Sequence, residues 1–421
     1  VKVEEEVFDF KKRGTPSFFN KESKRTVYIP WMGDHAFVMK AAFESHKVPA
    51  EVFSESDAET LEWGRKFTSG KECYPCILTT GDIVKTVKSP GFNPQKAAFF
   101  MPTASGPCRF GQYHKLQRMV LDELGCQEVP IISPNQAKNM YKELGLQGRN
   151  FVQQVWEGVV AVDLLDKMAR ENRPYEVNKG ETEGIYQDCL DKVCRAIRDK
   201  GSLPGALKEA GNTFQGIRTQ GEGEKPRIGI VGEIFVRNNK FSNDYLVNQI
   251  EELGGEAWLP PFTEWLFHVN GVLKLYNWLM KDYRSYLTVL VRDKVQRYSE
   301  RRLTRLVAGA LNNGEEPELK EIWRNAAPYL PSWFGEAALS LGKAVDYARK
   351  GLSGIINVMP FTCLPGTITT AALKRFREDY DDIPCLVMTY DGLEQTNTTT
   401  RLEAFIYQTN QYYHSQLKGK P

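Results

Sequence analysis

The chain has 421 residues, of which 41% are hydrophobic and 26% charged, a composition that excludes a disordered or low-complexity protein. Its 55 Lys and Arg nearly balance 53 Asp and Glu, so no basic excess suggests a nucleic-acid partner. No apolar run approaches the roughly 18 residues that cross a membrane, and the N-terminal stretch VKVEEEVFDFKKRG lacks the apolar region of a signal peptide. We therefore expect a soluble, cytoplasmic protein.

The first part of the chain, 1–135, has the pattern of an α/β domain. Short apolar runs at 26–33, 50–53, 96–103 and 127–134 predict strands, and helix-like segments at 35–46, 78–88 and 113–125 separate them. Strands that alternate with helices at this spacing indicate βαβ units and a parallel sheet.

A helical segment with a Gly-rich linker, 136–225, leads to a second α/β domain, 226–421. Strands are predicted at 227–233, 255–261, 354–360 and 384–392, and a helical insertion at about 264–343. The charged stretch RDKVQRYSERRLTR within this insertion predicts a solvated helix face. The expected fold is therefore two Rossmann-like open parallel-sheet domains with helical insertions.

Eight cysteines are too few for a disulfide scaffold in a chain of this length, so metal binding, redox chemistry or plain burial are their expected uses. Cys73 and Cys76 form a C-x-x-C in GKECYPC, which suits a redox dithiol, half of a zinc site or a pair of iron–sulfur ligands. Cys108 and Cys363 each follow a strand, Met-Pro and a few small or turn residues. Because open α/β sheets bind ligands beyond the carboxyl ends of their strands, these four could meet at a cleft between the domains.

The other four cysteines have weaker signals. Cys126 and Cys385 lie at the amino ends of strands and are expected to be buried hydrophobic residues. Cys189 and Cys194 share one helix with a spacing of five residues, about 140° apart, which is poor for a shared metal ion but compatible with a large cluster.

The spacing of the four main cysteines favours an iron–sulfur cluster. A structural zinc site usually takes two close pairs, whereas here one pair is joined by single cysteines 32 and then 255 residues further on. A site assembled in that way suits a cluster at a domain interface.

Four motifs resemble those of the 2-hydroxyacyl-CoA dehydratase and benzoyl-CoA reductase superfamily: TSGKECYPCILTTGD, MPTASGPCRFGQYHKL, NVMPFTCLPGTITT and YDGLEQTNTTTRLEAF. The resemblance covers about residues 25–410 and is greatest to the double-cubane cluster proteins. It implies cluster ligands at the Cys73/Cys76 motif, Cys108 and Cys363. A [8Fe–9S] double cubane takes about six cysteines, for which Cys189 and Cys194, or else Cys126 or Cys385, are candidates; the alternative is a single [4Fe–4S] cluster.

The resemblance also implies an activity and partners. A separate ATP-hydrolysing activase, a homodimer with its own [4Fe–4S] cluster, would supply low-potential electrons, and this chain, itself a homodimer, would reduce a small unsaturated substrate. Neither G-x-x-x-x-G-K-[ST] nor G-x-G-x-x-G occurs here, so the ATPase would be another polypeptide. The alternatives are a dehydratase-type subunit acting on an acyl-CoA and a non-catalytic electron carrier.

Residues beside the cysteine motifs could tune the cluster. Lys71 and Arg109 could supply positive charge, and Gly106 and Gly366 would allow backbone amides to approach sulfur.

Other residues could move protons. His35 and His114 are candidate proton donors, and Glu233 could relay a proton or pair with Arg237. Of the residues after the last strand, we expect Arg401 and Glu403 to fix the last helix to the sheet, and Asp391, Gln395 and Asn397 have no assigned role.

Overall fold

The structure is a computed structural model and describes residues 25–136, 140, 144, 150–314, 316–332, 335–393 and 397–418. These residues form two compact units. The first contains the described residues up to Trp31, Met39–Glu72 and Cys76–Val152, and the second contains Met32–Val38, Cys73–Pro75 and the chain from Gln153 onward. Each unit has one four-stranded parallel sheet, which confirms the predicted α/β class.

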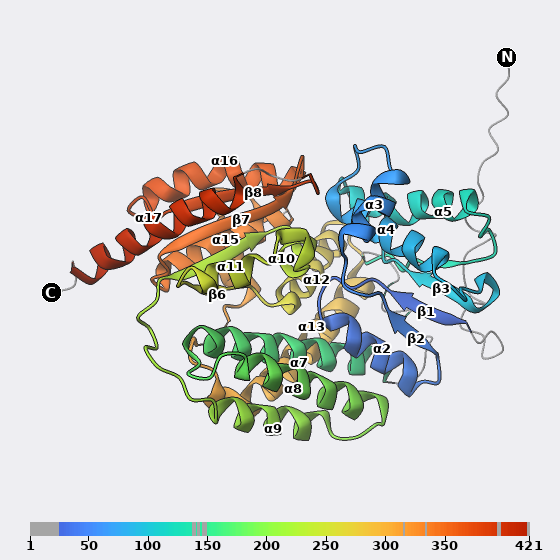
Figure 1. The fold of residues 1–421 in the computed structure, drawn as a ribbon, viewed down its shortest axis with the longest axis horizontal. Helices are drawn as coiled ribbons and strands as arrows, with labels where there is room; N and C mark the ends of the chain where they lie inside the picture. Colours follow the sequence, from blue (N-terminus) through green and yellow to red (C-terminus); the bar gives the residue numbers. More distant parts are fainter. Residues whose placement is uncertain are drawn as a thin grey trace, which may run out of the picture. The chain divides into compact units, whose positions relative to one another are not determined.

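The first sheet contains a strand in each of its four predicted segments, in the order β2-β1-β3-β4 (Figure 1). Its strands are β1 (Thr26–Ile29), β2 (Ala50–Val52), β3 (Ala97–Phe100) and β4 (Ile131–Ile132). The helices of this part of the chain are α2 (His35–Ser45), α3 (Ala58–Lys66), α4 (Tyr74–Lys88), η2 (Pro94–Lys96), η3 (Arg109–Gln112) and α5 (Tyr113–Glu123). Phe99, Ile83 and Leu121 pack together in the core between sheet and helices.

The second sheet also has a strand in each predicted segment, in the equivalent order β6-β5-β7-β8. Its strands are β5 (Arg227–Gly232), β6 (Glu256–Trp258), β7 (Gly354–Pro360) and β8 (Cys385–Tyr390). The helices connected directly to them are α10 (Ile234–Asn238), η5 (Phe241–Asn243), α11 (Leu246–Glu252), α15 (Glu336–Arg349), α16 (Leu364–Asp379) and α17 (Thr398–Lys418).

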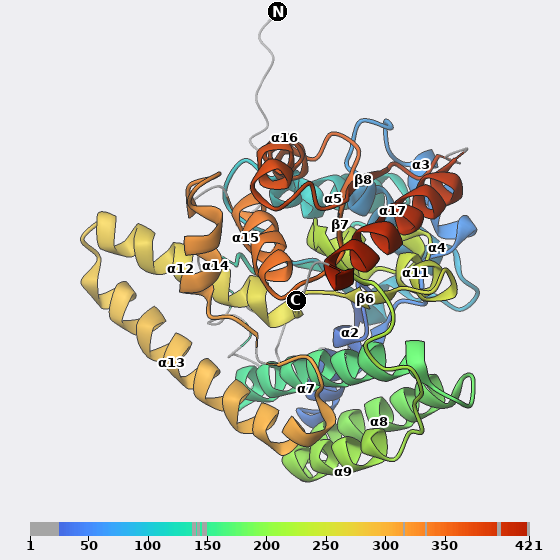
Figure 2. The same ribbon diagram turned by 90° about the vertical axis from the view of Figure 1, so that its left-hand side faces the viewer.

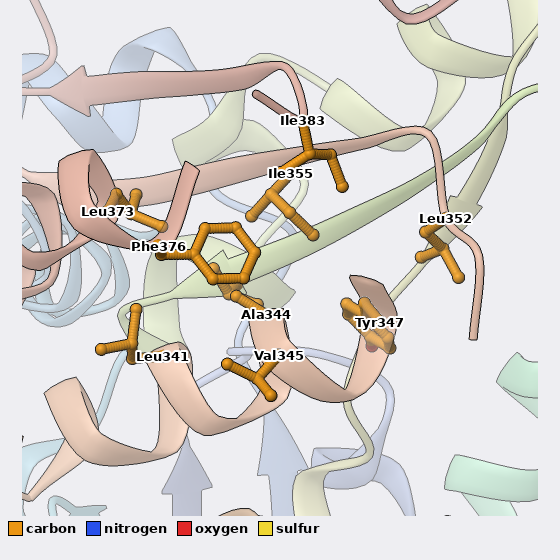
Figure 3. Close-up of a cluster of buried hydrophobic side chains, with 10 residues drawn as sticks. Leu341, Ala344, Val345, Tyr347, Leu352, Ile355, Leu373, Phe376 and Ile383 are labelled. Atoms are coloured by element: carbon orange, nitrogen blue, oxygen red, sulfur yellow. The ribbon is translucent and has the colours of Figure 1, made fainter. Parts of the chain in front are cut away.

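A buried hydrophobic cluster joins this sheet to α15 and α16 (Figure 3). Ile355 on β7 packs with Val345 and Tyr347 of α15 and with Phe376 of α16. A Cβ on Gly229 of β5 would lie 2.2 Å from the Tyr347 ring, so glycine is needed there for the ring to cover the strand. The predicted insertion, 264–343, therefore ends within α15, and this helix packs directly on the second sheet.

Further helices fill the second unit. Helices α7 (Phe151–Asn172), α8 (Glu181–Arg198) and α9 (Leu203–Gln215) lie side by side in Figures 1 and 2, with η4 (Arg173–Tyr175) between α7 and α8. The insertion after β6 contains α12 (Phe262–Leu279), α13 (Tyr283–Leu306), η6 (Ala308–Ala310) and α14 (Leu319–Ala326). Over the described part of the chain, no helix is long and apolar enough to cross a membrane.

Helix α13 differs from the solvated charged face that its sequence predicts. Asp293 is buried and accepts hydrogen bonds from Lys274 of α12 at 2.9 Å and from Arg297 at 3.2 Å. Charge density along a sequence does not show which side of a helix is covered, and here part of the charge faces inward.

The order of the strands creates one switch point in each sheet. From β1 the chain passes first to β2 on one side and then to β3 on the other, and β5, β6 and β7 repeat this pattern. The loops after β1 and β3, and those after β5 and β7, therefore leave neighbouring carboxyl ends in opposite directions, which is where open α/β sheets generally bind their ligands.

Two glycines allow α3 and α4 to touch. A Cβ on Gly81 would lie 1.9 Å from the Thr60 carbonyl oxygen, and one on Gly64 would lie 2.2 Å from that of Ile77. This contact fixes the helix that begins at the C-x-x-C.

We expect Gly81→Ala to lower the free energy of unfolding by about 2 kcal/mol, because α3 must move away from the new methyl group. Gly184→Ala in α8 is the matched control, since a Cβ there meets nothing within 4 Å and alanine favours helix. Chemical unfolding of both variants checks this, and equal stability of the two would contradict the close contact.

Candidate metal centre

Each of the four cysteines in the resemblance motifs lies at the beginning of a helix. Cys73 directly precedes α4 and Cys76 lies in its first turn, Cys108 precedes η3, and Cys363 precedes α16. Unsatisfied N–H groups give a helix start a partial positive charge, which favours the thiolate that binds a metal.

Cys108 and Cys363 occupy equivalent positions in the two sheets. Both are N-cap residues with almost the same backbone conformation, φ −66° and ψ 132° for Cys108 and φ −66° and ψ 122° for Cys363. Neither thiol caps its own helix, and both are at least partly exposed. Cys108 follows β3 and Cys363 follows β7, the third strand of each sheet in chain order, at the switch point.

Hydrogen bonds inside the first unit hold the Cys108 loop against the segment that carries the C-x-x-C. Arg109 Nη1 donates to the Lys71 carbonyl oxygen at 2.9 Å, and the buried amide of Gln117 on α5 donates to Thr79 Oγ1 of α4 at 3.1 Å. Lys71 therefore takes part in this contact through its backbone carbonyl group, and that carbonyl group orients the Arg109 guanidinium. The helix starts that carry Cys76 and Cys108 are therefore fixed next to each other.

The turn before Cys73 is fixed by Glu72. Its carboxylate accepts hydrogen bonds from the backbone N–H of Ser69 at 3.0 Å and of Lys71 at 3.1 Å. Burial alone would raise the pKa of Glu72, but these bonds outweigh it, so the pKa is lowered and the group stays ionised.

The two glycines named by the sequence have backbone and packing roles. Gly106, in the Cys108 loop, has φ +120°, a conformation that side-chain-bearing residues rarely adopt. A Cβ on Gly366 would lie 2.4 Å from Met359 Sδ, so glycine lets the start of α16 pack on β7 beside Cys363.

In the second unit a pair of half-buried carboxyl groups lies at the carboxyl end of β5. Glu233 is the N-cap of α10, and its carboxylate accepts from Phe235 N at 3.1 Å and Val236 N at 2.8 Å. Glu336 of α15 accepts from Ile234 N at 2.6 Å, so both groups bind the same helix start.

This pair holds a proton at neutral pH. Burial, and then the charge of Glu233, raises the pKa of Glu336 to about 8, and burial also raises the pKa of Glu233. The sequence identified Glu233 but missed Glu336, because Glu336 lies 103 residues further on in no motif. The alternative role of Glu233, an ion pair with Arg237, is not formed among the described residues; the two are joined by a hydrogen bond of 2.9 Å from the Arg237 backbone N–H to the Glu233 carbonyl oxygen.

The two histidines have different environments. His35 Nε2 shares a hydrogen bond of 2.9 Å with Asp163, whose carboxylate also accepts from Phe262 N and Thr263 N at the start of α12. Burial lowers the pKa of His35, but Asp163 more than compensates, so the pKa is raised. Burial and then the charge of Lys115 lower the pKa of His114, which leaves it mostly neutral at pH 7.

The remaining cysteines lie in packed regions. Cys189 on α8 is 2% exposed, and burial raises the pKa of its thiol to about 11; its neighbour Cys194 is half-buried on the same helix. Cys126 belongs to the core of the first sheet, and Cys385 packs against that of the second, where burial raises its pKa to about 12. Burial therefore disfavours the thiolate at Cys126, Cys189 and Cys385.

Of the residues after β8, Arg401 helps to fix the last helix, α17, to the sheet, as expected. Arg401 Nη2 donates to the Val387 carbonyl oxygen at 2.6 Å. Asp391 accepts from Leu393 N at 2.8 Å within its own turn, and Gln395 lies outside the described residues.

The donor set suits a thiolate-bound cluster in chemistry and in backbone placement. In the residues that the structure describes, no three or more His, Cys, Asp or Glu side chains are gathered as a metal site. The fit therefore rests on four thiols at helix starts, of which Cys76 and Cys108 belong to the first unit and Cys73 and Cys363 to the second. No family model and no curated protein matches the chain, so the family resemblance stays a prediction.

The Glu233–Glu336 pair makes stability depend on pH. Folded Glu336 holds its proton up to about pH 8, whereas an unfolded glutamate loses it near 4.5, so the folded state binds more protons in this window. Its stability must fall as the pH rises from 4.5 to 8.

We expect Glu336→Gln to flatten the fall in melting temperature between pH 5.5 and 8.5. Part of the slope will remain, because burial also raises the pKa of Asp82 and of Glu300 to about 7. Thermal unfolding across this range tests it, with exposed Glu378→Gln as the control. The same slope in all three proteins would refute a shared proton at this pair.

Proposed function

We propose that this protein is an iron–sulfur oxidoreductase component that receives low-potential electrons from a separate ATP-hydrolysing partner and reduces a small unsaturated substrate. The observation that supports it best is the equivalence of Cys108 and Cys363. Each is the N-cap cysteine after the third strand of a sheet, with the same backbone conformation and a preceding Met-Pro. Two sheets with the same strand order thus present a thiol at the same switch point.

The ligands in this proposal are Cys73, Cys76, Cys108 and Cys363. A low-potential cluster bound by them would supply electrons one at a time. The chain's own contribution is to hold the thiols at helix starts, where the partial positive charge stabilises thiolates, and to place the Arg109 guanidinium beside the Cys108 loop. Charge and hydrogen bonding around sulfur are what set a cluster's potential.

Reduction of an unsaturated bond consumes protons as well as electrons, and the Glu233–Glu336 pair is the proton reservoir that we assign. Glu336 holds a proton at neutral pH, and Glu233 stays anchored to α10 through two backbone N–H groups. An acid whose pKa lies near the working pH can both give and regain its proton. His35 is less suited to this role, because Asp163 holds its Nε2.

Two sizes of cluster are consistent with the resemblance, and they need different numbers of thiolate ligands. A [8Fe–9S] double cubane needs about six thiolates, which would include Cys189 and Cys194. Of these two, Cys189 is 2% exposed and burial raises the pKa of its thiol to about 11, so this thiol would give up its proton only on binding iron. A single [4Fe–4S] cluster is the alternative and would correspond to a dehydratase-type subunit, whereas a non-catalytic electron carrier would need the same ligands as the reductase.

Single substitutions test the ligand set. We expect Cys108→Ala and Cys363→Ala to lose at least half of the iron and of the visible absorbance after anaerobic purification, because each removes a thiolate from the cluster. Iron analysis and absorption spectra measure this.

Cys385→Ala is the matched control, since that thiol packs against a hydrophobic core. We expect it to retain the iron of the unsubstituted protein. Full iron content in Cys363→Ala would refute the proposed ligand set.

A further inference from the structure

The second unit has a pocket that the proposed redox function does not use. Its walls come mainly from α7 and α8, which lie below α10 and α11 in Figure 1, and from those two helices. All its lining residues belong to the second unit, and none of those described is a cysteine. The pocket has a volume of about 80 Å³. One water molecule needs about 10–15 Å³ of such space, so a group of several non-hydrogen atoms can enter it.

Arg237 of α10 brings an unpaired positive charge to this pocket. The residue lines the pocket and is only 6% exposed, and its buried Nε has no hydrogen-bond partner. Among the described residues, no carboxylate forms an ion pair with its guanidinium. A buried charge is costly unless it is paired, and arginine presents a planar fork of N–H donors that matches a carboxylate or a phosphate. The guanidinium therefore has the chemistry of an anion-binding group.

The carboxyl groups around Arg237 already have other partners. Burial raises the pKa of three of them, and the charge of Arg237 counteracts this rise; they are Glu233, Glu336 and Glu264. Glu233 and Glu336 accept hydrogen bonds from the start of α10, and Glu264 pairs with Lys343 at 3.5 Å. These groups balance the charge of Arg237 from a distance, and they leave its N–H groups available to a ligand.

Two further cations of the lining are paired within the chain. Arg173 pairs with Glu251 at 2.6 Å and with Glu183 at 3.3 Å. Arg170 pairs with Asp166, one turn earlier on α7. Because their charges are already compensated, these two arginines attract an incoming anion less than Arg237 does.

Lys240 is the fourth cation of the lining and lies three residues after Arg237. It is partly exposed, and no described carboxylate forms an ion pair with it. In total four cations and three carboxylates line the pocket. One of these carboxylates, that of Asp34, accepts a hydrogen bond from Tyr186 Oη at 2.7 Å. The small positive excess suits one anionic group and disfavours a polyanion.

The rest of the pocket offers apolar contacts. The Tyr245 ring, 45% exposed, lines it together with Val247 of α11 and Leu259, which follows β6. Ligand sites of small molecules combine such apolar walls with a few placed polar groups. A ligand with one charged end and a short apolar part therefore fits this lining better than a bare ion.

We propose that this pocket binds a small molecule through one oxyanion group, a carboxylate or a phosphate, with Arg237 as the principal binding residue and Lys240 as the second. The inference goes beyond the proposed redox function and does not depend on it, since every residue that carries it lies in the second unit.

The test is calorimetric titration of the intact, anaerobically purified chain with propionate, inorganic phosphate and propionamide, each to about 50 mM at constant low ionic strength, with the melting temperature as a second readout. At least one of the two anions should bind saturably and raise the melting temperature. Saturation by propionate alone would identify a carboxylate site, and saturation by phosphate alone a phosphate site. Propionamide has the shape of propionate without its charge and should not bind.

Variants identify the binding residues. Arg237→Gln should raise the dissociation constant about 10–100-fold, because it removes charged hydrogen bonds to the anion. Arg237→Lys keeps the charge but loses the planar fork and should also weaken binding. Lys240→Gln should weaken it about threefold, as expected for a partly solvated charge. Lys208→Gln is the matched control, since this lysine is exposed on α9 outside the pocket, and it should leave the dissociation constant unchanged.

The same variants separate binding from a purely structural role. If Arg237 only balanced the buried carboxyl groups, Arg237→Gln would change the melting temperature without ligand but not the dissociation constant, and that result would overturn the proposal. Absence of saturable binding by both anions would overturn it as well. Should Arg237→Gln fail to fold, Arg237→Lys and Lys240→Gln decide the matter, since the first retains the charge and the second alters a partly exposed side chain. Iron content measured on the same samples distinguishes either outcome from failure of the cluster.

Discussion

Hydrogen bonding between parallel strands fixes where the principal candidate groups of this protein lie. Parallel strands all end at the same edge of their sheet, and the shared strand order makes one gap in that edge where successive connections diverge. In the first sheet Cys108 follows the strand beside that gap, and in the second Cys363 and Glu233 follow the strands on its two sides. The positions of Cys108, Cys363 and Glu233 therefore follow first from the order of the strands and only then from side-chain contacts.

The local environment then divides the cysteines into two groups. Cys108 and Cys363 combine a helix start, whose unsatisfied N–H groups stabilise the thiolate, with partial exposure to solvent. Cys73 and Cys76 are buried at a helix start, whereas Cys189 and Cys385 are packed away from one, so burial is the largest influence on their pKa. The same low polarity that keeps those thiols neutral keeps a proton on Glu336. The electron-carrying and proton-carrying roles that we propose thus depend on one variable, the solvation of the charged form.

The sequence predicts the sheets well because their strands are short, apolar and bounded by turns, and all eight predicted segments contain a strand. It predicts less of what depends on contacts between distant segments. Glu336 and Asp163 act through partners about 100 and 128 residues away, and neither belongs to a motif. The inward charges and outward apolar side chains of α13 were missed for a related reason, since its mixed composition hides which face packs on α12.

The central claim is that four cysteines bind an iron–sulfur cluster, and the most direct measurement is iron and acid-labile sulfide per chain in protein purified without oxygen. The account predicts about eight irons for a double cubane, or about four for a single [4Fe–4S] cluster, each with a comparable amount of sulfide. Protein that contains only zinc, or that neither retains nor takes up iron and sulfide on anaerobic reconstitution, would contradict it.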